Sequence, residues 1–265
     1  MPQPLPGHPP LPAAFLGAPI AHRGRHDRAR GILENSRAAV RAAVAGGFGI
    51  EIDLQRSADG EAMVFHDATL SRLTARRGPV AAETAATLAA LPLGGAGPGE
   101  TIPTLAEILA LVAGRVPLLL EVKDPEDSCA PVDGVLERRV AALLAGYAGP
   151  VAVMSFNPHS VAHLAAAAPG VPRGLTTCAF DGPDWPLPDY RRAELAGIAD
   201  FGPTGAGFIS HDHRDLDSPA VSTLRAAGVP VLCWTIRSAA AEAAARRVAQ
   251  NVTFEGYDPA PRAAA

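Results

Sequence analysis

Two carboxylates placed two residues apart are the first sign of chemistry in this chain. Glu51 and Asp53 lie in the apolar run 48–54, and in a β-strand this spacing points both side chains to the same face. The turn dipeptide Asp59-Gly60 follows, and a second short apolar run ends in His66. This unit therefore places two carboxylates and an imidazole within reach of one another.

Two further apolar runs end in charged side chains. The first ends in His22 and Arg23, and the other ends in Glu121 and Lys123. Charged groups that gather where apolar runs end indicate a common site, because the ends of several strands meet at one face of a sheet or barrel.

The residue types in this set indicate a metal-and-phosphate site. Three carboxylates suit a hard, oxygen-preferring cation such as Ca²⁺ or Mg²⁺. Two histidines suit acid/base work near neutral pH, and the arginine and lysine supply donors for an anionic group. Together they describe phosphoryl transfer or phosphodiester cleavage, in which the metal and the cations offset charge in the transition state. The residues are His22, Arg23, Glu51, Asp53, His66, Glu121 and Lys123.

The elements that position these residues alternate regularly along the chain. Strands are expected at 18–23, 48–54, 117–122, 151–156, 174–177, 207–210, 229–236 and 252–255. Ala-rich helices are expected between them at 34–45, 105–112, 135–145, 158–167, 190–198, 216–227 and 239–250. Eight strands alternating with helices predict an α/β fold, a single (β/α)8 TIM-like barrel over residues 18–259. Residues 1–17 form an irregular, proline-rich lead-in, and 260–265 form a tail.

A small insertion is expected after the second strand. Only eight residues separate Asp53 from Ala62, too few for a parallel crossover, so the run 62–65 should fold back as a hairpin. A long loop then carries His66 and runs to Gly99. Thr104 caps the following helix, and Glu107 three residues later completes a capping box.

Other strand ends carry further candidates. Phe156, His211, Trp234 and Glu255 fall at or just past the ends of predicted strands, at the face where barrel enzymes place their catalytic groups. His211 is expected to contact substrate from there. The arginine run 72–77 is interpreted mainly as solvated loop.

Composition excludes several classes of partner. The 265 residues are 48% hydrophobic and carry a net charge of −4, which argues against nucleic acid. The apolar runs are too short to cross a bilayer, and the N-terminal segment makes a poor signal peptide. Three widely spaced cysteines fit a reducing compartment. We expect a cytoplasmic protein, and the sequence does not define its oligomeric state.

In order and spacing, these motifs resemble the glycerophosphodiester phosphodiesterase family, which shares its barrel with phosphatidylinositol-specific phospholipases C. The resemblance covers about residues 19–256. It rests on Ala21-His22-Arg23-Gly24, Glu34-Asn35-Ser36, Glu51-Ile52-Asp53, Asp59-Gly60, His66-Asp67 with Leu70 and Arg72, Ile102-Pro103-Thr104-Leu105, Glu121-Val122-Lys123, Ser155-Phe156 and Trp234-Thr235.

The resemblance implies hydrolysis of glycerophosphodiesters, such as glycerophosphocholine or glycerophosphoethanolamine, to sn-glycerol 3-phosphate and an alcohol. It implies that His22 and His66 are the acid/base pair. By the same resemblance Glu51, Asp53 and Glu121 bind one divalent ion, Ca²⁺, Mg²⁺ or Mn²⁺. Arg23 and Lys123 would hold the phosphate, and Phe156 and Trp234 would line the substrate wall. Direct attack by water and a route through a cyclic phosphate both remain open.

The chain departs from the family pattern at two positions. Arg237 stands where the family often has Asn, and the last strand runs into Phe254-Glu255-Gly256 instead of the usual Thr-Asp-x-Pro. These departures bear on substrate choice. Two alternatives stay open: a lipid phosphodiester substrate, as in a lysophospholipase D or a phosphoinositide-cleaving enzyme, and a barrel that binds phosphodiesters without cleaving them.

Overall fold

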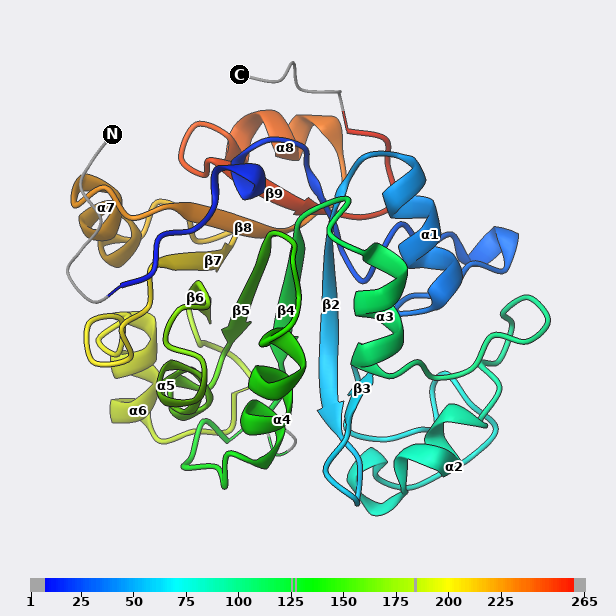
Figure 1. Cartoon of the computed structure of the whole chain (residues 1–265). Helices are drawn as coiled ribbons and strands as arrows, with labels where there is room; N and C mark the ends of the chain where they lie inside the picture. Colours follow the sequence, from blue (N-terminus) through cyan, green and yellow to red (C-terminus); the bar gives the residue numbers. More distant parts are fainter. Residues whose placement is uncertain (1–7, 125, 127, 184, 260–265) are drawn as a thin grey trace.

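A closed parallel barrel forms the centre of the molecule (Figure 1). This computed structural model describes residues 8–124, 126, 128–183 and 185–259, so the expected tail 260–265 lies outside the described residues. The eight barrel strands are β1 (Ile20–Ala21), β2 (Gly49–Arg56), β4 (Leu118–Val122), β5 (Val151–Ser155), β6 (Arg173–Thr177), β7 (Phe208–Asp212), β8 (Val231–Ile236) and β9 (Asn251–Phe254). Strand β1 pairs in parallel with both β2 and β9, which closes the barrel and confirms the predicted fold.

Seven helices follow the strands in alternation and cover the outside of the barrel (Figure 1). They are α1 (Arg37–Ala45), α3 (Leu105–Val112), α4 (Val135–Leu144), α5 (Pro158–Ala167), α6 (Asp189–Ala196), α7 (Pro219–Ala226) and α8 (Ala239–Ala245). The predicted capping box is confirmed, since the Thr104 side chain accepts from the Glu107 N–H and the Glu107 carboxylate accepts from the Thr104 N–H. At the start of α1, the Ser36 side chain accepts from the Ala39 N–H.

Alternation along each strand separates the outer core from the barrel interior. On β2, Ile50, Ile52 and Leu54 join the main apolar core beneath the helices, which turns Glu51 and Asp53 inward. The same alternation on β4 turns Leu119 and Glu121 inward. The barrel interior is therefore apolar at the N-terminal ends of the strands and charged at their C-terminal ends.

The insertion after β2 begins as predicted, with β3 (Ala62–Val64) antiparallel to β2. The expectation of a continuous loop up to Gly99 is wrong, however. The segment contains a 3₁₀ turn (Val80–Ala82) and the short helix α2 (Ala85–Ala89), which extend away from the barrel in Figure 1. These elements form because the segment has its own apolar cluster, in which Leu70, Leu88 and Ile102 are completely buried.

The described part of the lead-in, residues 8–17, also differs from the prediction of irregular structure, and residues 1–7 lie outside the described residues. Residues Ala13–Leu16 form a 3₁₀ helix, and Phe15 is completely buried. Phe15 packs in one cluster with Leu119, Phe208 and Leu232, whose side chains fill the interior near the N-terminal ends of the strands. The segment is ordered because it closes the apolar end of the barrel against water. Among the described residues, no helix combines the length and apolar character that crossing a membrane requires.

Candidate active site

Three buried carboxylates meet at the C-terminal end of the barrel. Glu51 and Asp53 lie on β2, and Glu121 lies on the adjacent strand β4 directly opposite Asp53. One oxygen from each carboxylate lies within 4.8 Å of the others. We call Glu51, Asp53 and Glu121 the carboxylate cluster. An all-oxygen donor set of this kind matches the preference of Ca²⁺ and Mg²⁺.

One atom of the carboxylate cluster lacks a partner that a cation would supply. Within the described part of the chain, the buried Glu51 Oε1 has no hydrogen-bond partner, while Oε2 accepts from the Arg23 backbone N–H at 2.9 Å. Burial, then the charges of Asp53 and Glu121, raise the pKa of Glu51 well above its ordinary value. The residues present therefore fit a divalent ion, since such an ion would satisfy this oxygen and stabilise the ionised carboxylate.

Asp53 is held in position by a residue outside the barrel strands. Asn35 Nδ2 donates to Asp53 Oδ2 at 2.8 Å, and the Asp53 N–H donates to Asn35 Oδ1 at 3.2 Å. Asn35 adopts a left-handed backbone (φ 55°), which asparagine tolerates better than most residues. In the sequence Asn35 stood out only as part of the motif Glu34-Asn35-Ser36, and the structure adds this contact to Asp53.

Two cations balance much of the buried negative charge. Lys123 Nζ lies 2.7 Å from Glu121 Oε1 and 3.5 Å from Asp53 Oδ1, and Arg23 Nε lies 3.3 Å from Asp53 Oδ2. Burial alone would lower the pKa of Lys123, but Glu121 and Asp53 outweigh it and raise the pKa. Burial would likewise raise the pKa of Asp53, but Lys123 and Arg23 outweigh it and lower the pKa. Both cations stay charged beside the cluster.

His22 lies between the carboxylate cluster and the last barrel strand. Its Nδ1 contacts Glu255 Oε2 at 2.5 Å, and its Nε2 lies 4.0 Å from Glu51 Oε2. Burial lowers the pKa of His22, although the hydrogen bond to Glu255 acts in the opposite direction. The sequence placed Glu255 at a strand end without connecting it to His22.

His66, which follows β3, has a comparable contact with a carboxylate. Its Nδ1 contacts Asp67 Oδ1 at 2.8 Å, and its backbone carbonyl accepts from Gln55 Nε2 at 2.9 Å. Gln55 follows Glu51 and Asp53 on the same face of β2 and is buried. The two-residue spacing that singled out the carboxylates therefore extends to Gln55, which the sequence analysis missed.

The arginine run 72–77 was expected mainly as solvated loop, but its first residue, Arg72, is held by ion pairs. Arg72 makes bidentate contacts to two carboxylates, with donor–acceptor distances of 2.7 and 2.9 Å to Glu34 and 2.6 and 2.8 Å to Asp67. Glu34 also accepts from Arg23 Nη1 at 2.7 Å. Burial would raise the pKa of Glu34, but hydrogen bonds from Arg72 and Arg23 outweigh it and lower the pKa to about 2. Arg72 thus connects the loop carrying His66 to Arg23.

Aromatic rings form one wall beside these charged groups. Phe156 lies 5.5 Å from Trp234 and 5.1 Å from Trp185, and Phe180 lies 4.6 Å from Trp185, measured between ring centroids. Phe156 and Trp234 were expected at this wall. Phe180 and Trp185 come from the segment after β6, whose only local signal was two aromatic residues in a Gly- and Pro-rich stretch.

His211 lies apart from the other predicted residues. Its side chain is fully buried, with Nδ1 2.8 Å from Thr177 Oγ1 and Nε2 3.1 Å from Asp215 Oδ2. Both ring nitrogens are thus engaged within the protein. This arrangement argues against the expected contact with substrate, and we give His211 no part in the proposed reaction.

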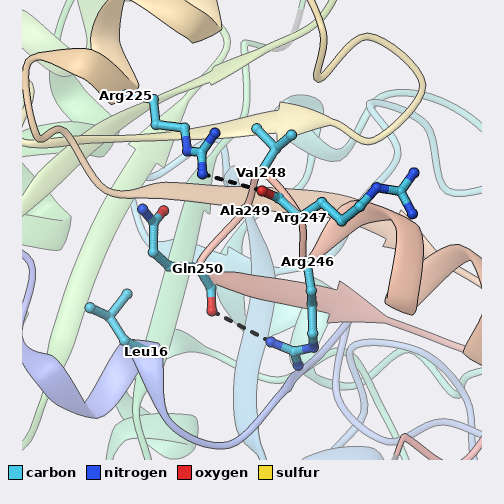
Figure 2. Close-up of a pocket in the computed structure, with 7 residues that line it drawn as sticks. All are labelled: Leu16, Arg225, Arg246, Arg247, Val248, Ala249 and Gln250. Atoms are coloured by element: carbon cyan, nitrogen blue, oxygen red, sulfur yellow. Dashed lines mark hydrogen bonds between the residues drawn. The ribbon is translucent and has the colours of Figure 1, made fainter.

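A cavity of about 300 Å³ lies at the other end of the barrel (Figure 2). It is lined by Leu16, which precedes β1, by Arg225 before β8, and by 246–250 before β9. Arg225 and Arg246 donate to the backbone carbonyls of Arg247 and Gln250, as Figure 2 shows. The two guanidinium groups therefore brace a loop at the N-terminal end, opposite the carboxylate cluster.

The fold and the site together define a (β/α)8-barrel protein with buried carboxylates, histidines and cationic side chains at one end of the barrel. A family model described as the glycerophosphoryl diester phosphodiesterase family matches residues 22–254. The chain therefore belongs to this family of phosphodiesterases, a class of hydrolases.

Known relatives agree with this assignment. A glycerophosphodiester phosphodiesterase from Caldanaerobacter subterraneus is 32% identical over 163 residues, which are 59% of this chain and 65% of that protein. A solved phosphodiesterase from Oleispira antarctica, in complex with the product sn-glycerol-3-phosphate, matches with a TM-score of 0.75 and 25% identity over 91% of this chain and 94% of that one. A glycerophosphodiester phosphodiesterase from Agrobacterium tumefaciens matches with a TM-score of 0.65 and 25% identity, covering 92% and 96% of the two chains.

Proposed function

We propose that this enzyme hydrolyses glycerophosphodiesters, such as glycerophosphocholine or glycerophosphoethanolamine, to sn-glycerol 3-phosphate and an alcohol. The observation that carries the proposal is the carboxylate cluster, flanked by His22, Arg23 and Lys123, in which the buried Glu51 Oε1 accepts no hydrogen bond from any described residue. The product named for the Oleispira antarctica phosphodiesterase is the product expected here.

Glu51, Asp53 and Glu121 would hold one divalent ion, with Ca²⁺ and Mg²⁺ preferred and Mn²⁺ acceptable. When bound, the ion would offset charge on the phosphoryl oxygens of the transition state. Arg23 and Lys123 lie beside the carboxylate cluster, and both would present cationic donors to a phosphate group. Asn35 supports this arrangement by fixing Asp53.

His22 and His66 would act as the acid/base pair. In each ring Nδ1 contacts a carboxylate, Glu255 for His22 and Asp67 for His66, so Nε2 is the nitrogen for proton exchange. One histidine removes the proton from the attacking hydroxyl, and the other protonates the alcohol oxygen as its bond to phosphorus breaks. The same two groups serve whether the attacking hydroxyl is water or the glycerol moiety.

The aromatic wall supports a preference for a cationic head group. Ring centroids lie 4.6–6.2 Å apart in four pairs formed by Phe156, Phe180, Trp185 and Trp234, with Phe156 in three of them, and aromatic faces attract quaternary ammonium groups. This argues for glycerophosphocholine as a substrate. The same apolar surface favours the second candidate, a lysophospholipase D acting on a lipid phosphodiester, because it would also contact an acyl chain.

We place the enzyme in the cytoplasm. The thiols of Cys178 and Cys233 are buried, and burial raises their pKa to about 11 and about 12. Buried thiols kept in their neutral form fit a reducing compartment.

The proposal is tested by measuring release of sn-glycerol 3-phosphate from glycerophosphocholine by the purified chain. The enzyme is first treated with EDTA, and Ca²⁺, Mg²⁺ or Mn²⁺ is then restored. We expect release that depends on the restored metal. Choline released from lysophosphatidylcholine, with glycerophosphocholine left intact, would favour the lipid candidate. Binding of either compound without turnover in the presence of metal would contradict both.

A further inference from the structure

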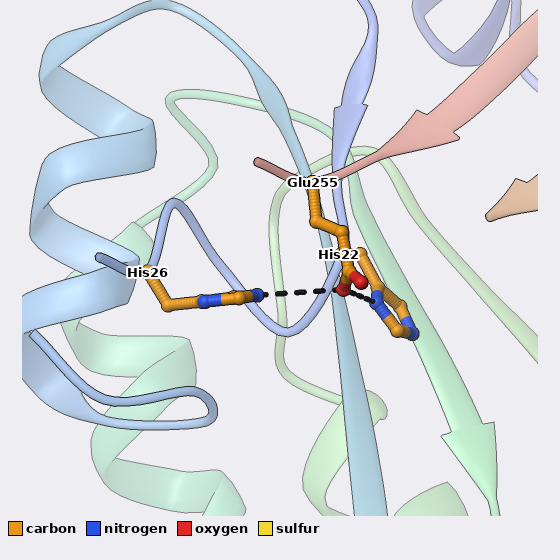
Figure 3. A group of neighbouring side chains, drawn as sticks. All are labelled: His22, His26 and Glu255. Carbon is orange, nitrogen blue, oxygen red and sulfur yellow. Dashed lines mark hydrogen bonds and ion pairs between the residues drawn. The ribbon is translucent and has the colours of Figure 1, made fainter. Parts of the chain in front are cut away.

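A second group of metal-ligating side chains lies next to the carboxylate cluster. His22 and His26 come from the loop after β1, and Glu255 directly follows β9 (Figure 3). One donor atom from each lies within 4.8 Å of the other two. Across the described residues, the carboxylate cluster is the one other group with this property. We call His22, His26 and Glu255 the histidine cluster.

Both imidazoles of the histidine cluster converge on the same carboxylate oxygen, as Figure 3 shows. His22 Nδ1 lies 2.5 Å from Glu255 Oε2, and His26 Nε2 lies 3.5 Å from it. The other oxygen, Oε1, accepts from Arg237 Nε at 2.7 Å. Arg237 therefore holds Glu255 with Oε2 facing the two rings. The two departures from the family pattern, Arg237 and Glu255, thus act on each other.

The donor set differs in kind from that of the carboxylate cluster. Two imidazole nitrogens and one carboxylate oxygen are the ligands of many zinc sites that keep an open fourth position. Zn–N and Zn–O bonds of about 2.0–2.1 Å place tetrahedral ligands about 3.3 Å apart. The spacing between His26 and Glu255 already matches this, and the contact between His22 and Glu255 would lengthen by about 1 Å.

The histidine cluster is accessible to an ion from solvent. The side chains of His22, His26 and Glu255 are 14%, 23% and 20% exposed, whereas Glu51 and Asp53 are 2% exposed. A cavity of about 500 Å³ is lined by His26 and Glu255. An ion in this cavity can therefore reach His26 and Glu255, which line it.

We propose that His22, His26 and Glu255 bind Zn²⁺ or a chemically similar divalent ion, and that this ion inhibits the enzyme. The inhibitory part rests on the proposed function, because it requires His22 to exchange protons. An imidazole that binds a metal through Nδ1 retains its proton on Nε2 and accepts no second one, so it leaves the acid/base cycle. One divalent ion would then support turnover from the carboxylate cluster, and another would block it from the histidine cluster.

Binding is measured on the full chain by competition for Zn²⁺ with a chromophoric chelator, in excess Mg²⁺ to fill the carboxylate cluster. We expect one Zn²⁺ per wild-type chain and at least about tenfold weaker binding for His26→Asn and for Glu255→Gln. The matched control is His159→Asn, on helix α5, which should bind as wild type does. Glu121→Gln, which alters only the carboxylate cluster, should also keep the zinc site.

Inhibition is measured on the same proteins with glycerophosphocholine and saturating Mg²⁺. One equivalent of Zn²⁺ should lower wild-type turnover at least tenfold, whereas the turnover of His26→Asn should be the same with and without Zn²⁺. Equal zinc affinity in wild type, His26→Asn and Glu255→Gln would overturn the proposal, as would loss of the zinc site in Glu121→Gln. If the wild type hydrolyses nothing, the proposed function fails, but the binding measurement still decides the zinc site.

Discussion

The carboxylate cluster and the histidine cluster are adjacent but built on different principles. The first stands on β2 and β4, is buried and offers only oxygen donors. The second stands on segments that follow β1 and β9, is partly exposed and offers two nitrogens and one oxygen. They meet at His22, whose Nδ1 contacts Glu255 and whose Nε2 lies 4.0 Å from Glu51.

The difference shows that one end of the barrel combines a group fixed by paired strands with a group held by loop residues. Hydrogen-bonded strands hold the carboxylates in a fixed register, and burial obliges Lys123 and Arg23 to stay beside them because unpaired buried charge is costly. The histidine cluster is held by one guanidinium, that of Arg237, and remains open to solvent. The donor atoms and the burial of the two clusters are the reason we propose different ions for them.

The largest expected effect comes from removing one ligand of the carboxylate cluster. Asp53→Asn should lower kcat/KM by about 10³-fold or more, because it removes an ion ligand and leaves Lys123 and Arg23 with less compensating charge. The measurement is steady-state hydrolysis of glycerophosphocholine in Mg²⁺, with thermal unfolding to confirm the fold. His159→Asn, on helix α5 and outside both clusters, is the control and should stay near the wild-type rate. A loss of less than tenfold in Asp53→Asn would contradict the assignment.

The next effect concerns the carboxylate shared by the histidine cluster and the proposed acid/base pair. Glu255→Gln should lower kcat about tenfold while KM changes little, because His22 Nδ1 loses the charge that fixes its orientation. Arg237→Gln leaves Glu255 in place and should have a smaller effect. An unchanged kcat, or a loss that appears only in KM, would show that Glu255 does not position His22.

A third prediction concerns the support behind the carboxylate cluster. Glu34 has its pKa lowered from 4.5 to about 2, so its contribution to folding stability is present above pH 4.5 and is lost as the pH falls toward 2. Glu34→Gln should therefore lower the free energy of unfolding by about 1–2 kcal/mol at neutral pH, allowing for solvent screening. In urea denaturation this difference should shrink between pH 4.5 and 2.

The control for Glu34 is Glu83→Gln, which removes a more exposed ion pair with Arg76. Its effect on the free energy of unfolding should stay below about 1 kcal/mol. If the difference in free energy of unfolding between wild type and Glu34→Gln is constant from pH 7 to pH 2, the charge of Glu34 does not contribute to the stability of the protein.

The smallest effect is expected at the aromatic wall, which neither cluster includes. Trp185→Leu should raise KM for glycerophosphocholine about threefold and leave KM for glycerophosphoethanolamine less changed, because a cation over an aromatic face contributes roughly 0.5–1 kcal/mol. Tyr190→Leu, at a residue that is 69% exposed, is the matched control. An equal change in KM for both substrates would contradict head-group recognition by the aromatic wall.

The barrel could be predicted from the sequence because its signals are local and repeated. Each strand is a short apolar run, each helix an Ala-rich stretch, and Thr104 with Glu107 marks a helix start by itself. Helix α2 and the 3₁₀ turn at Ala13–Leu16 escaped the same analysis. They are too short for a periodic pattern and form because tertiary packing buries Leu88 and Phe15.

In the candidate site, too, local features were predictable and long-range contacts were not. The spacing of Glu51 and Asp53 in one strand was enough to predict a shared face, because side chains alternate along any strand. The partners of Glu34, Arg72 and Asn35 were not predictable, since each depends on where a loop returns. For His211, the position at a strand end did not reveal that both ring nitrogens are engaged inside the protein.

By itself, the sequence determined the order of strands and helices, the inward face of β2 and the charged character of one barrel end. The tertiary structure alone decided that Glu255 contacts His22. These residues are 233 positions apart in the sequence, and they meet because β1 pairs with β9 to close the barrel. Alternation and capping act over a few residues, whereas closure brings together the two ends of the barrel domain, and a pattern read along the chain carries no signal for it.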